Sequence, residues 1–169
     1  MGTRSLTICK DQKKNVLLNM YRQYDGYPTG HGAELAEFLN GGELVNGLSS
    51  RDSGAVFNGM GCLAAQIVAR FKEDPGGIYL EPADARDVGE EYIYTVYPDK
   101  VPAKGKNGTI KLKVQAGCMT FFGLPGTKQD NMNIVFDDLP ENYDGEQVEE
   151  NEKNLPRPQN DFIESKQGG

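Results

Sequence analysis

The chain contains no tryptophan, one histidine and three cysteines among its 169 residues. Cys9, Cys62 and Cys118 lie far apart, form no Cys-x-x-Cys pair and are odd in number, which excludes a disulfide framework. With a single imidazole to accompany them, a zinc site is not expected either. We therefore predict three buried thiols in a reducing compartment, and neither a metal nor a cofactor.

Long apolar runs are also missing from the chain. No stretch of about 20 apolar residues is present, so no segment is expected to span a membrane. Residues 1–6 lack the apolar core of a secretory signal. We expect the protein to be cytoplasmic, and to act in the host cell cytoplasm if a phage encodes it.

The net charge of −7 belongs to the end of the chain. Residues 137–169 hold ten acidic and three basic side chains, whereas residues 1–136 hold fifteen of each sign. Because residues 1–136 carry no net charge, the sequence gives no support to direct nucleic-acid binding through a basic face. The composition predicts a single α+β domain over residues 1–136, followed by an acidic, disordered tail over residues 137–169.

The spacing of apolar residues predicts both strands and helices. Two alternating segments separated by a polar turn open the chain, which is typical of a β-hairpin. The expected strands are 4–10, 16–21, 78–80, 91–97, 109–115 and a short one near 132–136, and the expected helices are 33–39 and 53–71. We predict an α+β fold in which an antiparallel sheet, made of the hairpin and the later strands, packs against two helices.

The densest group of large polar side chains lies at residues 21–32, where a predicted strand leads through glycines into a predicted helix. Glycines let backbone amides approach a ligand, and a helix N-terminus attracts phosphate or carboxylate. An arginine can add a bidentate contact and a tyrosine can stack on a flat ring. The residues predicted to bind a small anionic, nucleotide-like ligand are Arg4, Tyr21, Arg22, Tyr24, Asp25, Tyr27, Gly30, His31 and Gly32.

The same side chains can instead pack the turn, with Asp25 bonding the loop backbone. The glycine spacing matches no known phosphate-binding motif, so both interpretations stay open. Strand alternation places Arg22 and Tyr24 on the face of Leu18 and Met20, and points Tyr21 the other way.

His31 is the only histidine available as a general base, and Asp25 is the nearest carboxylate in the sequence. These two residues are the candidates for catalysis in an alternative hypothesis. A histidine in the first turn of a helix can equally bond a loop carbonyl, which requires no reaction.

Two further motifs have simpler interpretations. Gly59 and Gly61 imitate part of a dinucleotide fingerprint, but no strand is expected before them, and we predict that they allow close helix packing. The acidic loop offers oxygen ligands to a cation without the spacing of an EF-hand, so a solvated rim is expected. Its residues are Glu81, Asp84, Asp87, Glu90 and Glu91.

Four segments together resemble a family of small uncharacterised proteins of bacteria and their phages. They are residues 1–7 (MGTRSLT), 21–28 (YRQYDGYP), 30–32 (GHG) and 89–94 (GEEYIY), and the similarity covers roughly residues 1–120. The family has no assigned reaction, so the resemblance supplies no catalytic residues. It implies a phage-associated accessory protein of the kind that counters host immunity by binding a nucleotide signal or an effector protein.

Three functional hypotheses follow from the sequence. The leading one is non-enzymatic capture of a small anionic ligand at the strand–helix junction, as a means of countering host defence. The second is an inhibitor that contacts a host defence protein, with the acidic tail imitating nucleic acid. The third is a small hydrolase or transferase that uses His31. A homo-oligomer is compatible with capture, since sequestering proteins often place their sites between subunits.

Overall fold

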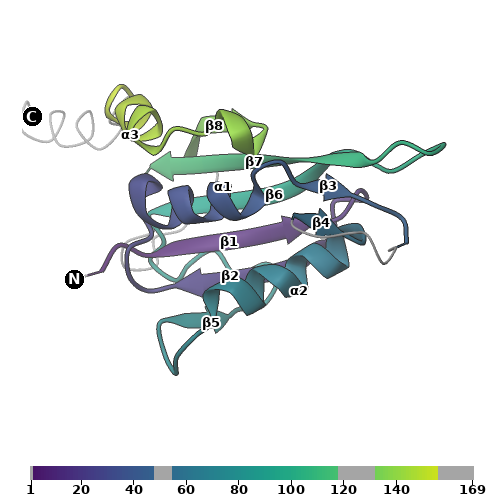
Figure 1. Cartoon of the computed structure of the whole chain (residues 1–169). Helices are drawn as coiled ribbons and strands as arrows, with labels where there is room; N and C mark the ends of the chain where they lie inside the picture. Colours follow the sequence, from purple (N-terminus) through teal and green to yellow (C-terminus); the bar gives the residue numbers. More distant parts are fainter. Residues whose placement is uncertain (1, 48–54, 118–131, 156–169) are drawn as a thin grey trace, which may run out of the picture.

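The computed structural model describes residues 2–47, 55–117 and 132–155 (Figure 1). The described helical elements are α1 (Ala33–Leu39), α2 (Gly59–Phe71), α3 (Gly145–Lys153), a π-helical turn η1 (Pro28–Gly32) and a 3-10 turn η3 (Pro140–Asn142). The described strands are β1 (Ser5–Lys10), β2 (Val16–Arg22), β3 (Glu43–Leu44), β4 (Val56–Phe57), β5 (Ile78–Leu80), β6 (Tyr92–Lys100), β7 (Gly108–Gly117) and β8 (Met132–Asp138).

The strands form one mixed sheet in the order β4-β3-β7-β6-β1-β2-β5, and β8 pairs with the far end of β7. β1 lies near the centre, where it runs antiparallel to β2 and parallel to β6. In this register Leu6 of β1 lies opposite Tyr21 on one side and Ile93 on the other. The α+β class is thus confirmed, with a mixed sheet in place of the expected antiparallel one.

Helices α1 and α2 lie side by side on one face of the sheet (Figure 1). Their apolar side chains, among them Leu35, Leu63 and Ile67, join inward-facing strand residues such as Tyr94 and Leu112 in the main hydrophobic core. The opposite face carries a smaller apolar cluster of Leu6, Ile8, Ile93 and Met132. Each face of the sheet therefore has its own apolar contacts. Because successive side chains of a strand point to opposite faces, the position of a polar residue in a central strand determines the face on which it lies.

The N-terminal hairpin is confirmed by the antiparallel pairing of β1 with β2. β6 is buried on both faces between β1 and β7, as its aromatic and β-branched composition predicts. β7 alternates between buried and half-buried residues along its whole length, which confirms that one of its faces is wet. The apolar group near residue 134 adds a last strand, β8.

The long helix begins later than its apolar spacing predicts. Val56 belongs to β4, where it pairs with Glu43, and α2 starts at Gly59, whose φ of +86° turns the chain into the helix. Ser53 lies outside the described residues. The predicted role of the glycines is wrong as well, because a Cβ on Gly59 or Gly61 would meet no atom within 4 Å.

The predicted acidic tail is folded over its first part. β8 runs to Asp138, and α3 follows with Asp144 as its N-cap, whose side chain accepts hydrogen bonds from the amides of Glu146 and Gln147. Val148 of α3 is 1% exposed and belongs to the main core. The boundary expected after residue 136 is therefore wrong, and a third helix joins the two predicted ones, while residues 156–169 lie outside the described residues.

Candidate functional site

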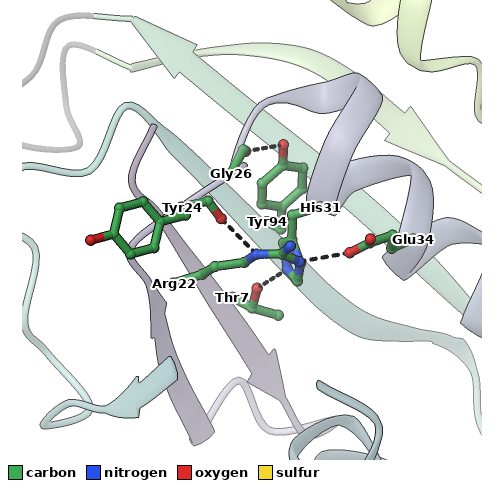
Figure 2. A network of polar contacts seen from close by, with 7 residues as sticks. All are labelled: Thr7, Arg22, Tyr24, Gly26, His31, Glu34 and Tyr94. Atoms are coloured by element: carbon green, nitrogen blue, oxygen red, sulfur yellow. Dashed lines mark hydrogen bonds and ion pairs between the residues drawn. The ribbon is translucent and has the colours of Figure 1, made fainter. Parts of the chain in front are cut away.

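His31 occupies the centre of a polar network beneath α1 (Figure 2). Its Nε2 lies 2.7 Å from Thr7 Oγ1, and its Nδ1 lies 2.9 Å from Arg22 Nη1. A guanidinium can only donate, so Nδ1 accepts and the ring proton sits on Nε2, which donates to Thr7. The two neighbours therefore fix the tautomer of a neutral imidazole.

The surroundings of His31 keep it neutral. The residue is fully buried, and burial, followed by the positive charges of Arg22 and Arg70, lowers its pKa to about 3. The rings of Phe71 and Tyr94 pack edge-on against the imidazole, with centroids 4.8 and 5.2 Å away. With both nitrogens occupied and the ring closed off from solvent, the geometry opposes the general-base role of the third hypothesis.

Arg22 connects this buried network to the surface. Its Nε donates to the carbonyl of Tyr24 at 2.7 Å, and its Nη1 donates to Glu34 Oε2 at 2.7 Å as well as to His31. The side chain of Arg22 is 17% exposed, and that of Glu34 is 45% exposed. Arg22 is thus held in one orientation at the end of β2, with its outer edge reaching the surface.

The loop amides are occupied by carbonyls of the same loop. The amide of His31 donates to Asp25 O at 2.8 Å, and the amides of Gly30 and Gly32 both donate to Tyr27 O. The prediction that these amides bind an anion is therefore wrong, because carbonyls of the same turn already accept their hydrogen bonds. Gly32 is required for packing, since a Cβ there would clash with the hydroxyl of Tyr143.

An open cavity of about 400 Å³ adjoins the exposed edge of Arg22. Tyr24 and Glu34 line it together with Arg22, and Arg70 and Phe71 line it from α2. The remaining wall is the loop that follows α2, with Glu73, Asp74, Pro75, Gly76, Gly77 and Ile78.

This loop has a fixed shape. Gly76 and Gly77 adopt φ values of +81° and +75°, which favour glycine. The ammonium of Lys72 donates to the carbonyls of Gly76 and Ile78, and Gly77 O accepts a hydrogen bond from the amide of Gln23. The cavity wall is therefore tied to both α2 and β2.

The sequence-predicted site residues divide into three groups: those that line the cavity, those that lie away from it and those that build the turn. Arg22 and Tyr24 line the cavity, and Tyr24 is 54% exposed. Tyr21 lies on the opposite face of the sheet, where its ring meets Tyr79 at 6.2 Å and packs against the smaller apolar cluster. Arg4 lies beside Gly89 and Glu91, outside the cavity lining.

The remaining predicted residues build the turn. Asp25, with φ of +61°, supplies its carbonyl to His31, and Tyr27 supplies the carbonyl that Gly30 and Gly32 share. Among the residues around the site that were not predicted are Thr7, Glu34, Arg70 and Phe71. Glu34 follows His31 by three positions, the spacing at which two helical side chains meet, so that signal was present.

Helix α3 covers the outer side of η1. Glu149 Oε2 accepts hydrogen bonds from the amide and the hydroxyl of Thr29, at 2.8 and 2.7 Å. Tyr143 Oη donates to Pro28 O, and Tyr92 Oη donates to Glu152 Oε1. Two of the carboxylates expected to imitate nucleic acid, Glu149 and Glu152, are thus engaged in hydrogen bonds within the protein.

The thiols and acidic groups give no sign of other chemistry in the described part of the chain. Cys9 is buried, and burial together with Asp11 raises its pKa to about 12. Cys62 is only partly buried, contrary to expectation, and Cys118 lies outside the described residues. Glu90 is buried and accepts the amide of Val88, so it supports its own loop. No group of three or more His, Cys, Asp or Glu is placed to hold a metal among residues 2–47, 55–117 and 132–155.

Comparison of the chain with protein-family models, with curated proteins and with solved structures gave no match. None of the described helices is both long and apolar enough to cross a membrane.

Proposed function

We propose that the protein is a non-enzymatic binding protein that captures a small anionic ligand in the cavity beside Arg22. The orientation of Arg22 carries this proposal. Three hydrogen bonds through Nε and Nη1 hold the guanidinium, and its contacts within the described residues leave Nη2 for a ligand at the cavity edge. A donor that is already fixed loses little conformational entropy when it binds.

The charges around the cavity narrow the class of ligand. Arg22 and Arg70 carry positive charge in the lining, and Glu34, Glu73 and Asp74 carry negative charge, so the net charge of the lining is −1. Glu34 already pairs with Arg22. A ligand that combines one anionic group with hydrogen-bond donors matches such a mixed lining. The exposed ring of Tyr24 offers a stacking surface for a flat base. A nucleotide-like molecule has all three features, and about 400 Å³ suits its size.

Binding without turnover is favoured by the state of His31. The imidazole is buried, neutral and hydrogen-bonded on both nitrogens, so it positions Arg22 and does not exchange a proton with a bound molecule. The described cysteine in the core, Cys9, is likewise protonated and remote from solvent. Capture therefore fits the site better than hydrolysis or group transfer.

The proposed cellular role is that of a phage accessory protein that counters host defence by sequestering a nucleotide signal. This part is supported by the resemblance of residues 1–7, 21–28, 30–32 and 89–94 to small bacterial and phage proteins. A sequestering protein needs a pocket and no catalytic machinery, which agrees with the chemistry of the Arg22 cavity.

The test has two steps. Mass spectrometry of small molecules released from the heat-denatured protein should recover a phosphate-containing compound at near-equimolar yield. Calorimetry with adenosine monophosphate should then give a dissociation constant that rises about tenfold or more in Arg70→Gln and in Tyr24→Ala. Lys106→Gln removes one positive charge from the remote turn at 103–106 and serves as the matched control.

Arg70 and Tyr24 are chosen because their side chains line the cavity without hydrogen-bonding to the buried network, which Tyr24 joins only through its backbone carbonyl. Their substitution should leave thermal unfolding unchanged, so a loss of binding reports on the ligand site itself. Capture in this cavity would be refuted if the heat-denatured protein released no phosphate-containing compound. It would also be refuted if neither substitution weakened the binding of adenosine monophosphate.

A further inference from the structure

A second cavity lies on the sheet face opposite α1 and α2. It has a volume of about 440 Å³, and it is lined by Lys10, Asp11, Gln12, Lys14, Thr95, Tyr97, Pro98 and Lys113. It shares no lining residue with the Arg22 cavity. Three lysines and one carboxylate give its lining a net charge of +2, in a chain whose net charge is −7.

The sheet register brings the lysines together. Thr95 of β6 lies opposite Ile8 of β1 on one side and opposite Lys113 of β7 on the other. Ile8 belongs to the apolar cluster on the face away from the helices, so Lys113 and Thr95 share that face. Lys10 follows Ile8 by two positions and points the same way, which places two ammonium groups from different strands at one cavity.

The β1–β2 turn adds Lys14 to this group. Asp11 Oδ1 accepts the amides of Lys13 and Asn15 at 2.8 and 2.9 Å, and its Oδ2 accepts the side-chain amide of Asn15. These bonds shape the turn in which Lys14 adopts a φ of +68°. The single carboxylate of the lining is therefore engaged by the backbone of the turn and not by an ammonium group.

None of the three lysines forms an ion pair with a residue in the described segments. Lys111, two positions before Lys113, is paired with Asp99 at 3.7 Å, and Asp137 accepts a hydrogen bond from Tyr97. The pKa of Lys10 is lowered, first by burial and then by the positive charges of Lys113, Arg86 and Lys14. Asp137 lies opposite Lys113 in the β7–β8 register without forming an ion pair with it. Like charges gathered around a hollow favour a ligand of opposite charge.

We propose that this lysine-lined cavity binds the phosphate or pyrophosphate group of a small phosphorylated molecule. Lysines suit phosphate because each ammonium is a compact charge with three donors that rotate freely to meet tetrahedral oxygens. The carboxamide of Gln12 and the hydroxyl of Thr95 supply uncharged partners in the lining. The cavity is too small for a folded partner, and its volume of about 440 Å³ suits a small phosphorylated molecule up to the size of a nucleotide.

Isothermal titration with sodium pyrophosphate at low ionic strength tests this site in the full-length protein. We expect binding to one site per chain and a dissociation constant that rises about tenfold or more in Lys10→Gln and in Lys113→Gln. Lys113→Arg keeps the charge and should retain binding within about threefold, while Lys106→Gln in the remote turn should bind as the wild type does. Thermal unfolding of each variant establishes that the fold is intact.

Two outcomes would overturn the proposal. One is the absence of pyrophosphate binding at millimolar concentration, or an affinity that the two lysine-to-glutamine variants leave unchanged. The other is tighter binding of a single-stranded DNA 20-mer that is lost in the same variants, which would assign the lysines to a polymer backbone. Loss of pyrophosphate binding in the glutamine variants, with retention in Lys113→Arg, supports it.

Discussion

Thr7 of β1 accepts a 2.7 Å hydrogen bond from Nε2 of His31, which lies 24 positions later in the sequence. This bond completes a chain of polar contacts that runs from the interior of the sheet through His31 and Arg22 to Glu34 at the surface. Buried polar groups of this kind are stable only while every member has a partner. The network therefore both supports the fold and orients the guanidinium proposed to meet a ligand.

Replacing Thr7 by valine removes the acceptor and leaves the Nε2–H of His31 buried without a partner. We expect Thr7→Val to lower the free energy of unfolding by about 1–3 kcal/mol, as measured by urea denaturation. Thr109→Val removes an exposed hydrogen bond to Asp99 and should cost about 0.5 kcal/mol or less. Equal effects of the two substitutions would show that the Thr7–His31 bond adds nothing.

The single histidine gives a direct spectroscopic test of its buried state. The Cε1–H resonance of His31 should not titrate between about pH 5 and pH 8 in the folded protein, because its pKa is lowered to about 3. Nuclear magnetic resonance on the unmodified protein is sufficient, since no other imidazole is present. A titration midpoint near 6.5 would show that the ring reaches solvent.

The same shift sets the acid sensitivity of the fold. In the unfolded chain His31 returns to its ordinary pKa of 6.5, so between pH 6.5 and 3 the unfolded state binds more protons than the native state. The contribution of the neutral ring to the free energy of unfolding is fully present above pH 6.5, and it declines as the pH falls toward 3. The stability lost over this window is on the order of 5 kcal/mol for a completely buried group.

Helix α3 should contribute to stability despite its acidic composition. Val148→Ala is expected to lower the free energy of unfolding by about 1–3 kcal/mol, because the side chain is part of the main core. Glu150→Gln, at an exposed position of the same helix, should change it by about 0.5 kcal/mol or less. A value near zero for Val148→Ala would mean that α3 does not pack on the sheet in solution.

Gly59 and Gly61 offer a matched pair of substitutions to alanine. Gly59→Ala should destabilise the protein by about 1–2 kcal/mol, because alanine at a φ of +86° is strained. Gly61→Ala should stabilise it by about 0.5–1 kcal/mol, because the position is helical and open. Thermal unfolding of the two variants in the same buffer distinguishes these opposite signs.

Lys10 should titrate at lower pH than an isolated lysine. Removing the charge of Lys113 with Lys113→Gln should raise the pKa of Lys10, since one of the causes that lower it would be gone. Burial, Arg86 and Lys14 would still lower the pKa of Lys10 in this variant. The titration can be followed by ¹³C resonance of methylated lysines, and an unchanged Lys10 midpoint would place Lys113 too far away to matter.

The local part of the fold could be predicted from the sequence. Alternation and helical spacing located the hairpin, α1 and β6, and they also assigned Arg22 and Tyr21 to opposite faces of β2. The parallel pairing of β1 with β6 could not be predicted, because it joins residues almost 90 positions apart and no local signal encodes it. Thr7 enters the site only through such tertiary placement.

Two errors in the prediction from sequence had different physical causes. Helix α3 was overlooked because only Val148 marks its apolar face, although Asp144 and Gln147 have the spacing of a capping box. The anion cradle at Gly30 and Gly32 was predicted for an ordinary helix start, whereas the π-helical turn consumes those amides with its own carbonyls. Glycine content alone does not distinguish a free amide from an occupied one.

The position of β1 between β2 and β6 has a consequence for biosynthesis. β1 leaves the ribosome before the other described strands, and its hairpin with β2 can form at once from neighbouring residues. Its other edge stays open until residues 92–96 have emerged, so the backbone donors and acceptors of residues 5–9 that face β6 remain unpaired until then. Sheet completion is thus a late, non-local event, and a nascent chain stalled before β6 exposes an unpaired edge that invites pairing with other chains.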